Sequence, residues 1–284
     1  MNIFKKLKKI LFRVVINLDK ETVFYELRKL YFDGIVRRQN EASQFNWEQF
    51  NADAKPARFE DLTGLFFCSP LTRGILRQDI DEAALIFKTV SAISSAKGVE
   101  IGRYYGGSTV LCATAIGDTG KLYSIDVSPK NNDLELIKVL QKLGFQDRVS
   151  LIVDDANNVN IAEELDFVLI DGDHSYEGAR LDHNRWGERL KSGGFLIHHD
   201  MACTRPYSVQ WSDLKELYQD IQKTQENCLK IVGQAGSMVV FLKTSETWIN
   251  VPSKTKQETN KLGLQSRDNS YLSGEAKSNK FTQL

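Results

Sequence analysis

The chain of 284 residues has few cysteines and no cysteine motif. Its four cysteines are isolated, with no C-x-x-C spacing: Cys68, Cys112, Cys203 and Cys228. This pattern excludes a zinc finger or a disulfide scaffold, and predicts reduced thiols in a cytoplasmic protein. Net charge is also missing, because 37 Lys and Arg residues balance 37 Asp and Glu. No overall field therefore favours nucleic acid as a partner. No apolar run approaches the roughly 20 residues of a membrane-spanning helix.

The N-terminus has a basic amphipathic pattern over residues 1–18. In helical geometry its apolar residues share one face, and the opposite side carries five Lys and Arg residues. The apolar face comprises Phe4, Leu7, Leu11, Val14, Val15 and Leu18. Such a helix lies in a membrane interface, or it docks on its own domain or on a partner subunit of a homodimer. The sequence leaves these alternatives open.

Composition divides the chain into four parts. After the basic helix of residues 1–19, a helical period predicts a small helical cap over residues 20–78. Residues 79–247 carry the main domain, which opens with an amphipathic helix over 79–96. Residues 248–284 are rich in Lys, Ser, Thr, Asn and Gln, and predict a disordered tail.

The main domain alternates apolar strands with amphipathic helices. We expect strands at 98–101, 121–126, 149–153, 166–171 and 194–199, and helices at 108–116, 133–144, 157–164 and 175–190. Two last apolar runs, 229–232 and 238–242, are joined by too few residues for a helical crossover, so they should pair antiparallel. The sequence predicts an α/β fold, a Rossmann-like seven-stranded and mostly parallel sheet with a final antiparallel pair.

A glycine-rich loop follows the first predicted strand, in the segment 99–109 (VEIGRYYGGST). Glycines let the backbone pass close to a ligand, and the Ser-Thr pair at its end can cap a helix. Asp126 ends the second strand 24 residues after Gly102, where a carboxylate can bind a ribose. The spacing is G-x-x-x-G-G, whereas a dinucleotide loop reads G-x-G-x-x-G, and the carboxylate of Glu100 suits a cationic ligand. We therefore expect S-adenosylmethionine, and an NAD-dependent oxidoreductase is disfavoured.

Five segments in this order resemble class I S-adenosylmethionine-dependent methyltransferases: VEIGRYYGGST, SIDVSP, VDDA, LDFVLIDGDHSYEGARLDHNRW and LKSGGFLIHHD. The resemblance covers about residues 75 to 245, and is greatest to the catechol and macrolide-sugar O-methyltransferase-like group. It implies that Asp126 binds the ribose and that Asp155, with Ala156, meets the adenine. Asp155 could instead cap a helix after the third strand. The resemblance implies that the loop around the methionine part comprises Glu100, Gly102, Tyr104, Gly106 and Ser108.

Polar residues follow two neighbouring predicted strands, at the edge where open α/β sheets bind ligands. Asp171 ends one strand, and His199 and Asp200 end the next. Converging carboxylates suit Mg²⁺ or Ca²⁺, and in metal-dependent relatives these three positions hold a divalent ion. The imidazole of His199 would instead favour Mn²⁺, Fe²⁺ or Zn²⁺ as the bound ion. The alternative is that Asp171 and Asp200 only position substrate or cap loops.

All four histidines lie near this edge, within 26 residues. His174 follows Asp171 and is the candidate general base for a hydroxyl acceptor. His183 should be structural, and His198 should point away from His199 because strand side chains alternate. With Asp171 and Asp200 placing the acceptor and His174 as its base, we expect methyl transfer to a hydroxyl of a small molecule, sugar or glycolipid. The alternative is a methyltransferase-fold binding or scaffold protein without catalysis.

Overall fold

The computed structural model describes residues 55–66, 75–128, 133–204 and 211–254. The chain divides into two units, residues 1–251 and 252–284, and every element below belongs to the first. The basic segment 1–18 and most of the expected cap and tail lie outside the described residues, so those assignments stay predictions.

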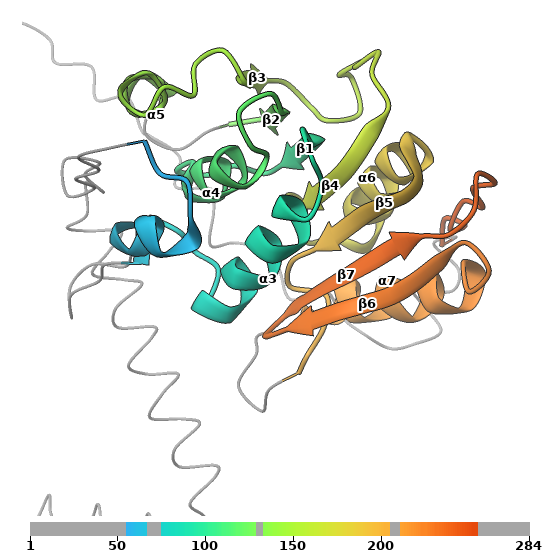
Figure 1. Ribbon diagram of the computed structural model, residues 1–284. Helices are drawn as coiled ribbons and strands as arrows, with labels where there is room; N and C mark the ends of the chain where they lie inside the picture. Colours follow the sequence, from blue (N-terminus) through green and yellow to red (C-terminus); the bar gives the residue numbers. More distant parts are fainter. Residues whose placement is uncertain (1–54, 67–74, 129–132, 205–210, 255–284) are drawn as a thin grey trace, which may run out of the picture. The chain divides into compact units, whose positions relative to one another are not determined.

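A seven-stranded sheet forms the centre of the first unit, in the order β3-β2-β1-β4-β5-β7-β6 (Figure 1). Strands β1 to β5 pair in parallel, and β7 runs antiparallel to both β5 and β6. This confirms the predicted sheet. Its strands are β1 (Lys97–Ile101), β2 (Lys121–Asp126), β3 (Val149–Val153), β4 (Leu165–Ile170), β5 (Leu190–His198), β6 (Leu229–Ala235) and β7 (Met238–Lys243).

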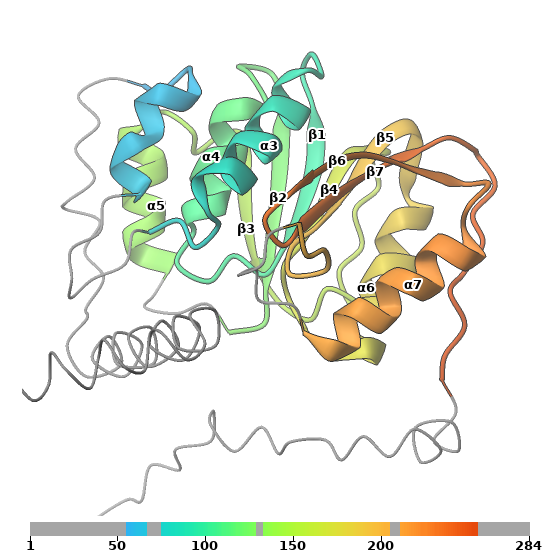
Figure 2. The ribbon, with the colours of Figure 1, turned by 90° about the horizontal axis from the view of Figure 1, so that it is seen from below.

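Helices cover both faces of the sheet (Figure 2). One face packs against η2 (Phe59–Phe66), α3 (Ile80–Ser91), α4 (Gly107–Ala115) and α5 (Asp133–Lys142). The other packs against α6 (Tyr176–Glu188) and α7 (Ser212–Thr224). Strand β4 is buried along its whole length and feeds both cores, because its side chains alternate. Phe167 and Leu169 pack on the α3–α5 side, and Val168 and Ile170 pack on the α6–α7 side.

The structure differs from the sequence prediction at four places. The helix expected over 157–164 is wrong: the backbone N–H of Asn157 donates to Asp155 Oδ1 at 2.8 Å, which turns the chain. Val159 and Ile161 are both buried, two residues apart, a spacing that suits extended chain. Helix α7 was not predicted, and α3 ends five residues before the expected position 96. The expected tail begins too early, since Val251 is 0% exposed.

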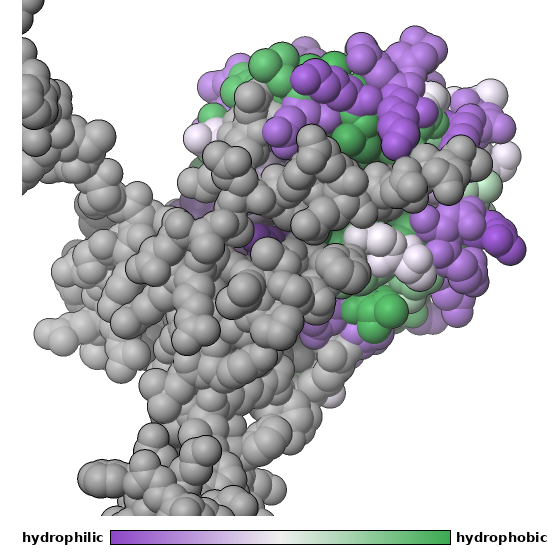
Figure 3. All heavy atoms as spheres, turned by 90° about the vertical axis from the view of Figure 1, so that its left-hand side faces the viewer, coloured by the Kyte–Doolittle hydropathy of each residue, from purple (hydrophilic) through white to green (hydrophobic). Residues whose placement is uncertain are grey.

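The surface of the described residues is mixed in character. In Figure 3 purple hydrophilic and green hydrophobic patches lie side by side on the face that is not covered by grey atoms. Among the described helices, none combines the length and the apolar character that crossing a membrane requires. Cys112, Cys203 and Cys228 are free thiols, as predicted.

Candidate active site

The glycine loop brings the end of β1 against the end of β4. Gly102 has φ +84°, and a Cβ atom there would lie 2.2 Å from the backbone oxygen of Asp171. Gly106 has φ +85°, and a Cβ atom there would lie 2.5 Å from the Leu136 side chain on α5. Both positions therefore need glycine, for the backbone angle and for the space. The loop and Asp171 share one edge of the sheet.

Asp126 fixes the shape of this loop. Its Oδ2 accepts hydrogen bonds from the backbone N–H groups of Arg103 and Tyr104, both at 3.0 Å, and its Oδ1 accepts one from Ser128 at 2.8 Å. These bonds hold Tyr104 at φ +51°, a conformation unusual for a residue with a side chain. The structure thus places the carboxylate predicted for a ribose directly beside the glycine loop. A carboxylate can accept further hydrogen bonds beyond these.

Arg103 turns inward beneath the loop, and the sequence did not reveal this role. Its side chain is buried, and its guanidinium donates to the backbone oxygens of Ser124 and Ile152. It also forms an ion pair with Asp133 at 2.6 Å. One side chain therefore ties β2, β3 and α5 to the loop, because the planar guanidinium donates in several directions.

Glu100 lies beneath the loop and not on its open side. It is 0% exposed, and its Oε2 accepts hydrogen bonds from the hydroxyls of Thr109 and Ser124, both at 2.6 Å. Burial raises the pKa of this carboxyl. Thr109 is therefore no helix cap: the N-cap of α4 is Gly106, without a side-chain bond, and Ser108 is buried in the first turn. The position predicted to meet a cationic ligand supports the loop from below.

The expected adenine position lies after β3. Asp155 is exposed, and its Oδ1 accepts from the backbone of Asn157, while Ala156 is 5% exposed. Because no helix follows, the capping alternative for Asp155 is wrong. Nearby, Asp182 of α6 accepts from the Asn157 side chain at 3.3 Å. Burial, with the charges of Asp155 and Asp173, raises the pKa of Asp182 to about 7.

His174 and Asp200 form a pair at the ends of β4 and β5. His174 Nε2 lies 3.1 Å from Asp200 Oδ2, and the Trp211 indole N–H donates to the same oxygen at 3.3 Å. Asp200 Oδ1 accepts from the Ser237 hydroxyl at 3.0 Å, and the backbone at Asp200 has φ +57°. Burial opposes the charge on His174, but Asp200 and Asp171 outweigh it and raise its pKa. Strained backbone at a polar cluster is typical of functional sites.

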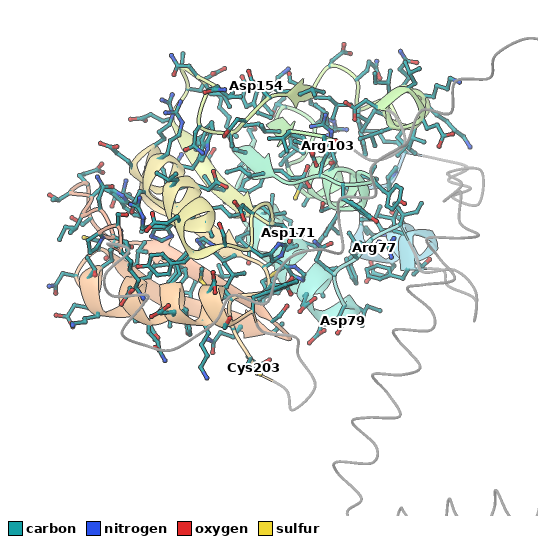
Figure 4. The ribbon with its side chains drawn as sticks, turned by 180° about the vertical axis from the view of Figure 1, so that it is seen from behind. Arg77, Asp79, Arg103, Asp154, Asp171 and Cys203 are labelled. Carbon is teal, nitrogen blue, oxygen red and sulfur yellow. The ribbon has the colours of Figure 1, made fainter. Side chains whose placement is uncertain are left out.

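His199 lies between two carboxylates. Its Nδ1 is 3.0 Å from Asp171 Oδ1, and its Nε2 is 3.3 Å from Glu82 Oε2 on helix α3. Burial opposes its charge, but Asp171, Glu82 and Asp200 outweigh this and raise the pKa of His199 well above its usual value. Gln78 Nε2 donates to the other oxygen of Asp171 at 2.7 Å. In Figure 4, Asp171 lies between Arg103 on the loop side and Asp79 at the start of α3.

The edge just described coincides with a segment shared with known proteins. The profile of a methyltransferase domain family matches residues 99–201. Over residues 99–201 the chain is similar to that methyltransferase domain family. This confirms, for that segment, the resemblance found in the motifs. Three residues that contact His199 or Asp200 lie outside the matched residues: Glu82, Ser237 and Trp211.

Similar curated proteins are O-methyltransferases of plants. Tricin synthase 2 of Oryza sativa subsp. japonica is 28% identical over 163 residues, which cover 54% of this chain and 54% of that protein. Caffeoyl-CoA O-methyltransferase of Mesembryanthemum crystallinum is 27% identical over 133 residues, which cover 43% of this chain and 50% of that protein. The chain spans about half the length of the curated relatives it matches. A solved structure, the O-methyltransferase TomG of Streptomyces achromogenes, is 13% identical over 60% of this chain and 82% of its own, with TM-score 0.48.

The matched segment, residues 99–201, contains a candidate group of metal-ligand atoms, but the group does not suit Mg²⁺. One ligand atom each from Asp171, His174 and Asp200 lie within 4.8 Å of one another. Mg²⁺ prefers six oxygens in octahedral geometry, and here one of the three donors is a nitrogen. Of the predicted ligands, His199 presents both nitrogens to carboxylates. Its Nδ1 also lies 3.6 Å from Asp200 Oδ2, and the surrounding carboxylates raise the pKa of the ring, which favours its cationic form. Unit charges 4 Å apart interact by about 4 kcal/mol at an effective dielectric of about 20, so an added cation would be repelled.

The other two histidines lie on the opposite face of β5. His198 Nε2 is 2.9 Å from His183 Nδ1, and His183 Nε2 is 2.7 Å from Gln225 Oε1. Both rings are buried, and burial lowers the pKa of His183 to about 4 and that of His198 well below 6.5. This confirms that His198 and His199 point to opposite faces. It also confirms that His183 is packed inside the protein.

Sequence reasoning missed the residues that reach Asp171, His199 and Asp200 from outside the matched segment. Glu82 carried one available signal: it shares a helical face with the buried Ile86 and Val90, where an apolar residue is expected. A buried carboxylate at such a position indicates a partner. Gln78, Trp211 and Ser237 carried no comparable signal, because each stands in a short segment outside the regular pattern.

Proposed function

We propose that this chain transfers a methyl group from S-adenosylmethionine to a hydroxyl oxygen of a small molecule. The observation that carries the proposal is the shared sheet edge. There the loop from Gly102 to Gly106, fixed by Asp126, stands against Asp171 and next to the pair of His174 and Asp200. Methyl transfer to a hydroxyl needs a nucleoside site and a proton acceptor side by side.

The residues of the loop fit the cofactor by their chemistry. The lack of a Cβ atom at Gly102 lets the loop pack against the backbone of Asp171, which brings the loop to the edge where the ligand would bind. The first-turn N–H groups of α4 have no partner within the helix and suit the methionine carboxylate. Asp126 would hold the ribose hydroxyls, and Asp155 with Ala156 would meet the adenine.

His174 would take the proton of the acceptor hydroxyl. Its Nε2 faces Asp200, so among the described residues Nδ1 is the ring nitrogen left for the acceptor. Asp200 orients the ring and stabilises it once it is protonated. The acceptor oxygen then forms a bond to the methyl carbon, and the proton stays on His174. S-adenosylmethionine, when bound, supplies the methyl group, and the electron pair of the breaking C–S bond stays on sulfur.

The acceptor class is the coarser part of the proposal. Relatives named for caffeoyl-CoA methylation and for tricin synthesis support a small-molecule hydroxyl. Sugar and glycolipid hydroxyls form the second class to be screened.

Should residues 1–18 bind anionic membranes, their deletion would abolish sedimentation with anionic vesicles and leave cofactor affinity unchanged.

The test of cofactor binding is calorimetry of the full chain with S-adenosylhomocysteine and, separately, with NAD. We expect S-adenosylhomocysteine to bind and Asp126→Ala to weaken it at least tenfold, because hydrogen bonds to a charged group contribute about 1.5–3 kcal/mol. Asp147→Ala is the matched control, an exposed aspartate two residues before β3 at the opposite edge of the sheet. Unchanged binding in Asp126→Ala, or preference for NAD, would contradict the cofactor assignment.

A methyl-transfer screen separates an enzyme from a binding protein. The chain is incubated with radiolabelled S-adenosylmethionine and panels of phenols, sugars and lipid-linked glycans. Label in an acceptor that requires His174 supports the proposal. Tight binding of S-adenosylhomocysteine with no transfer to any panel favours the binding or scaffold alternative.

A further inference from the structure

Three carboxylates converge on one imidazole at the acceptor side. The His199 ring lies 3.0 Å from Asp171, 3.3 Å from Glu82 and 3.6 Å from Asp200. All four side chains are at most 20% exposed. Carboxylates brought together away from water repel one another unless a cation lies between them.

The hydrogen bonds define the charge of this ring. Glu82 accepts from the backbone N–H groups of Asp79 and Ser237, at 2.7 and 2.6 Å, so it acts as an ionised acceptor. Asp171 accepts from the Gln78 amide in the same way. Two ionised carboxylates can each receive a hydrogen bond from His199 only if both ring nitrogens carry hydrogen, and the ring is then an imidazolium.

We infer that His199 is the built-in cation of the acceptor side, and that the Glu82–His199–Asp171 bridge lets the site work without a divalent ion. The inference rests on the proposed function. It assigns a role to Glu82, which comes from a helix 117 residues earlier in the chain than His199.

The remaining oxygens support the same conclusion. The second oxygen of Asp171 is taken by Gln78, and those of Asp200 are taken by Ser237, Trp211 and His174. A divalent ion would have to displace these donors and lie beside the imidazolium. The arrangement is complete as it stands, because every carboxylate oxygen of Glu82, Asp171 and Asp200 has a hydrogen-bond donor.

A fixed cation also suits the chemistry of the acceptor. The hydroxyl oxygen gains negative charge as it loses its proton, and it does so close to Asp171 and Asp200. Without His199 those carboxylates would repel the developing charge. With His199 in place their charge is partly neutralised, and His174 stays free to accept the proton.

The test is titration of the full chain with MnCl₂ and with MgCl₂ in the calorimeter, with S-adenosylhomocysteine present and absent. For the parent we expect no saturable binding of either ion. For His199→Asp we expect saturable Mn²⁺ binding, with an affinity at least tenfold above the weakest binding that the parent titration would detect, because a fourth carboxylate replaces the cation. Gln146→Asp is the matched control, an added carboxylate at an exposed position, and should behave as the parent.

Each outcome decides the inference. Saturable binding by the parent that Asp171→Asn removes would overturn it, and so would loss of methyl transfer when the parent is treated with a chelator. If parent and His199→Asp both bind no ion, His199 is not what replaces one, and the inference fails. Should His199→Asp not fold, the parent and Asp171→Asn titrations still decide. Failure of the proposed function looks different, because S-adenosylhomocysteine binding or methyl transfer would then be missing.

Discussion

His198 and His199 are neighbours on one strand end, yet they lie in opposite surroundings. His199 faces α3 and is enclosed by carboxylates, whereas His198 faces α6 and contacts another histidine, His183. Burial alone would lower both pKa values. The carboxylates raise the pKa of His199 well above 6.5, while that of His198 falls well below it. Burial therefore does not determine the charge of a histidine; its partners do.

The two surroundings also differ in their tasks. The His174–His199 side has open access through His174, whose side chain is 33% exposed, and it meets the sheet edge where ligands bind. The His183–His198 side is sealed by the Trp248 ring, 5.3 Å from that of His183, and by Gln225. On the proposed function, the side with His174 and His199 serves the chemistry, whereas the His183–His198 pair serves packing. The predictions below separate these two roles.

The largest expected effect is on catalysis. His174→Ala should lower turnover about 10²–10⁴-fold, since that is the usual contribution of a general base. Affinity for S-adenosylhomocysteine should stay within twofold, because His174 lies on the acceptor side. The measurement is methyl transfer with the acceptor found in the screen, beside calorimetry. As a control, His183→Ala should keep the cofactor affinity of the parent. Equal turnover in His174→Ala and the parent would refute the role of His174 as the general base.

The packed pair should dominate stability. His183→Ala leaves His198 and Gln225 without their buried partner and removes the contact with Trp248. We expect a loss of roughly 2–4 kcal/mol in the free energy of unfolding, from unsatisfied polar groups and a cavity. Urea denaturation measures it. A loss as large in His174→Ala would erase the contrast between the pairs.

Much of this contrast could be predicted from sequence, and part could not. Strand periodicity places His198 and His199 on opposite faces, and the spacing from Gly102 to Asp126 places the glycine loop and this carboxylate at one edge of the sheet. Local patterns determine both. Glu82 and Ser237 meet His199 and Asp200 only through the packing of α3 and of the turn between β6 and β7, and no local pattern specifies such a contact. The wrong helix over 157–164 has a local cause, because Asp155 and Asn157 form a turn that competes with helix.

The dependence of stability on acid pH tests the neutral His183–His198 pair directly. The pKa of His183 is about 4 in the folded chain and about 6.5 unfolded, so the unfolded state binds protons first as pH falls. Stability from this residue is present above pH 6.5 and is lost on the way down to pH 4. Between pH 7.5 and pH 5 the loss should be about 2 kcal/mol. Denaturation across this range should show a shallower dependence in His183→Gln, and an identical slope in both proteins would contradict the assignment.

Asp182 extends the comparison to carboxylates that have no imidazolium among them. Burial, with Asp155 and Asp173 nearby, raises its pKa to about 7, whereas His174 and His199 help to lower that of Asp200. A raised acid pKa means that the folded state holds the proton longer, so stability is lost as pH rises from about 4 to about 7. Asp182→Asn cannot ionise and can still accept from Asn157. It should therefore be more stable than the parent by about 4 kcal/mol at pH 8, since each of the three pKa units contributes about 1.4 kcal/mol, and nearly equal to it below pH 4. Thermal denaturation at the two pH values measures the difference, with Asp147→Asn as the exposed control. A variant less stable than the parent at pH 8 would mean that the charged carboxylate has a stabilising partner after all.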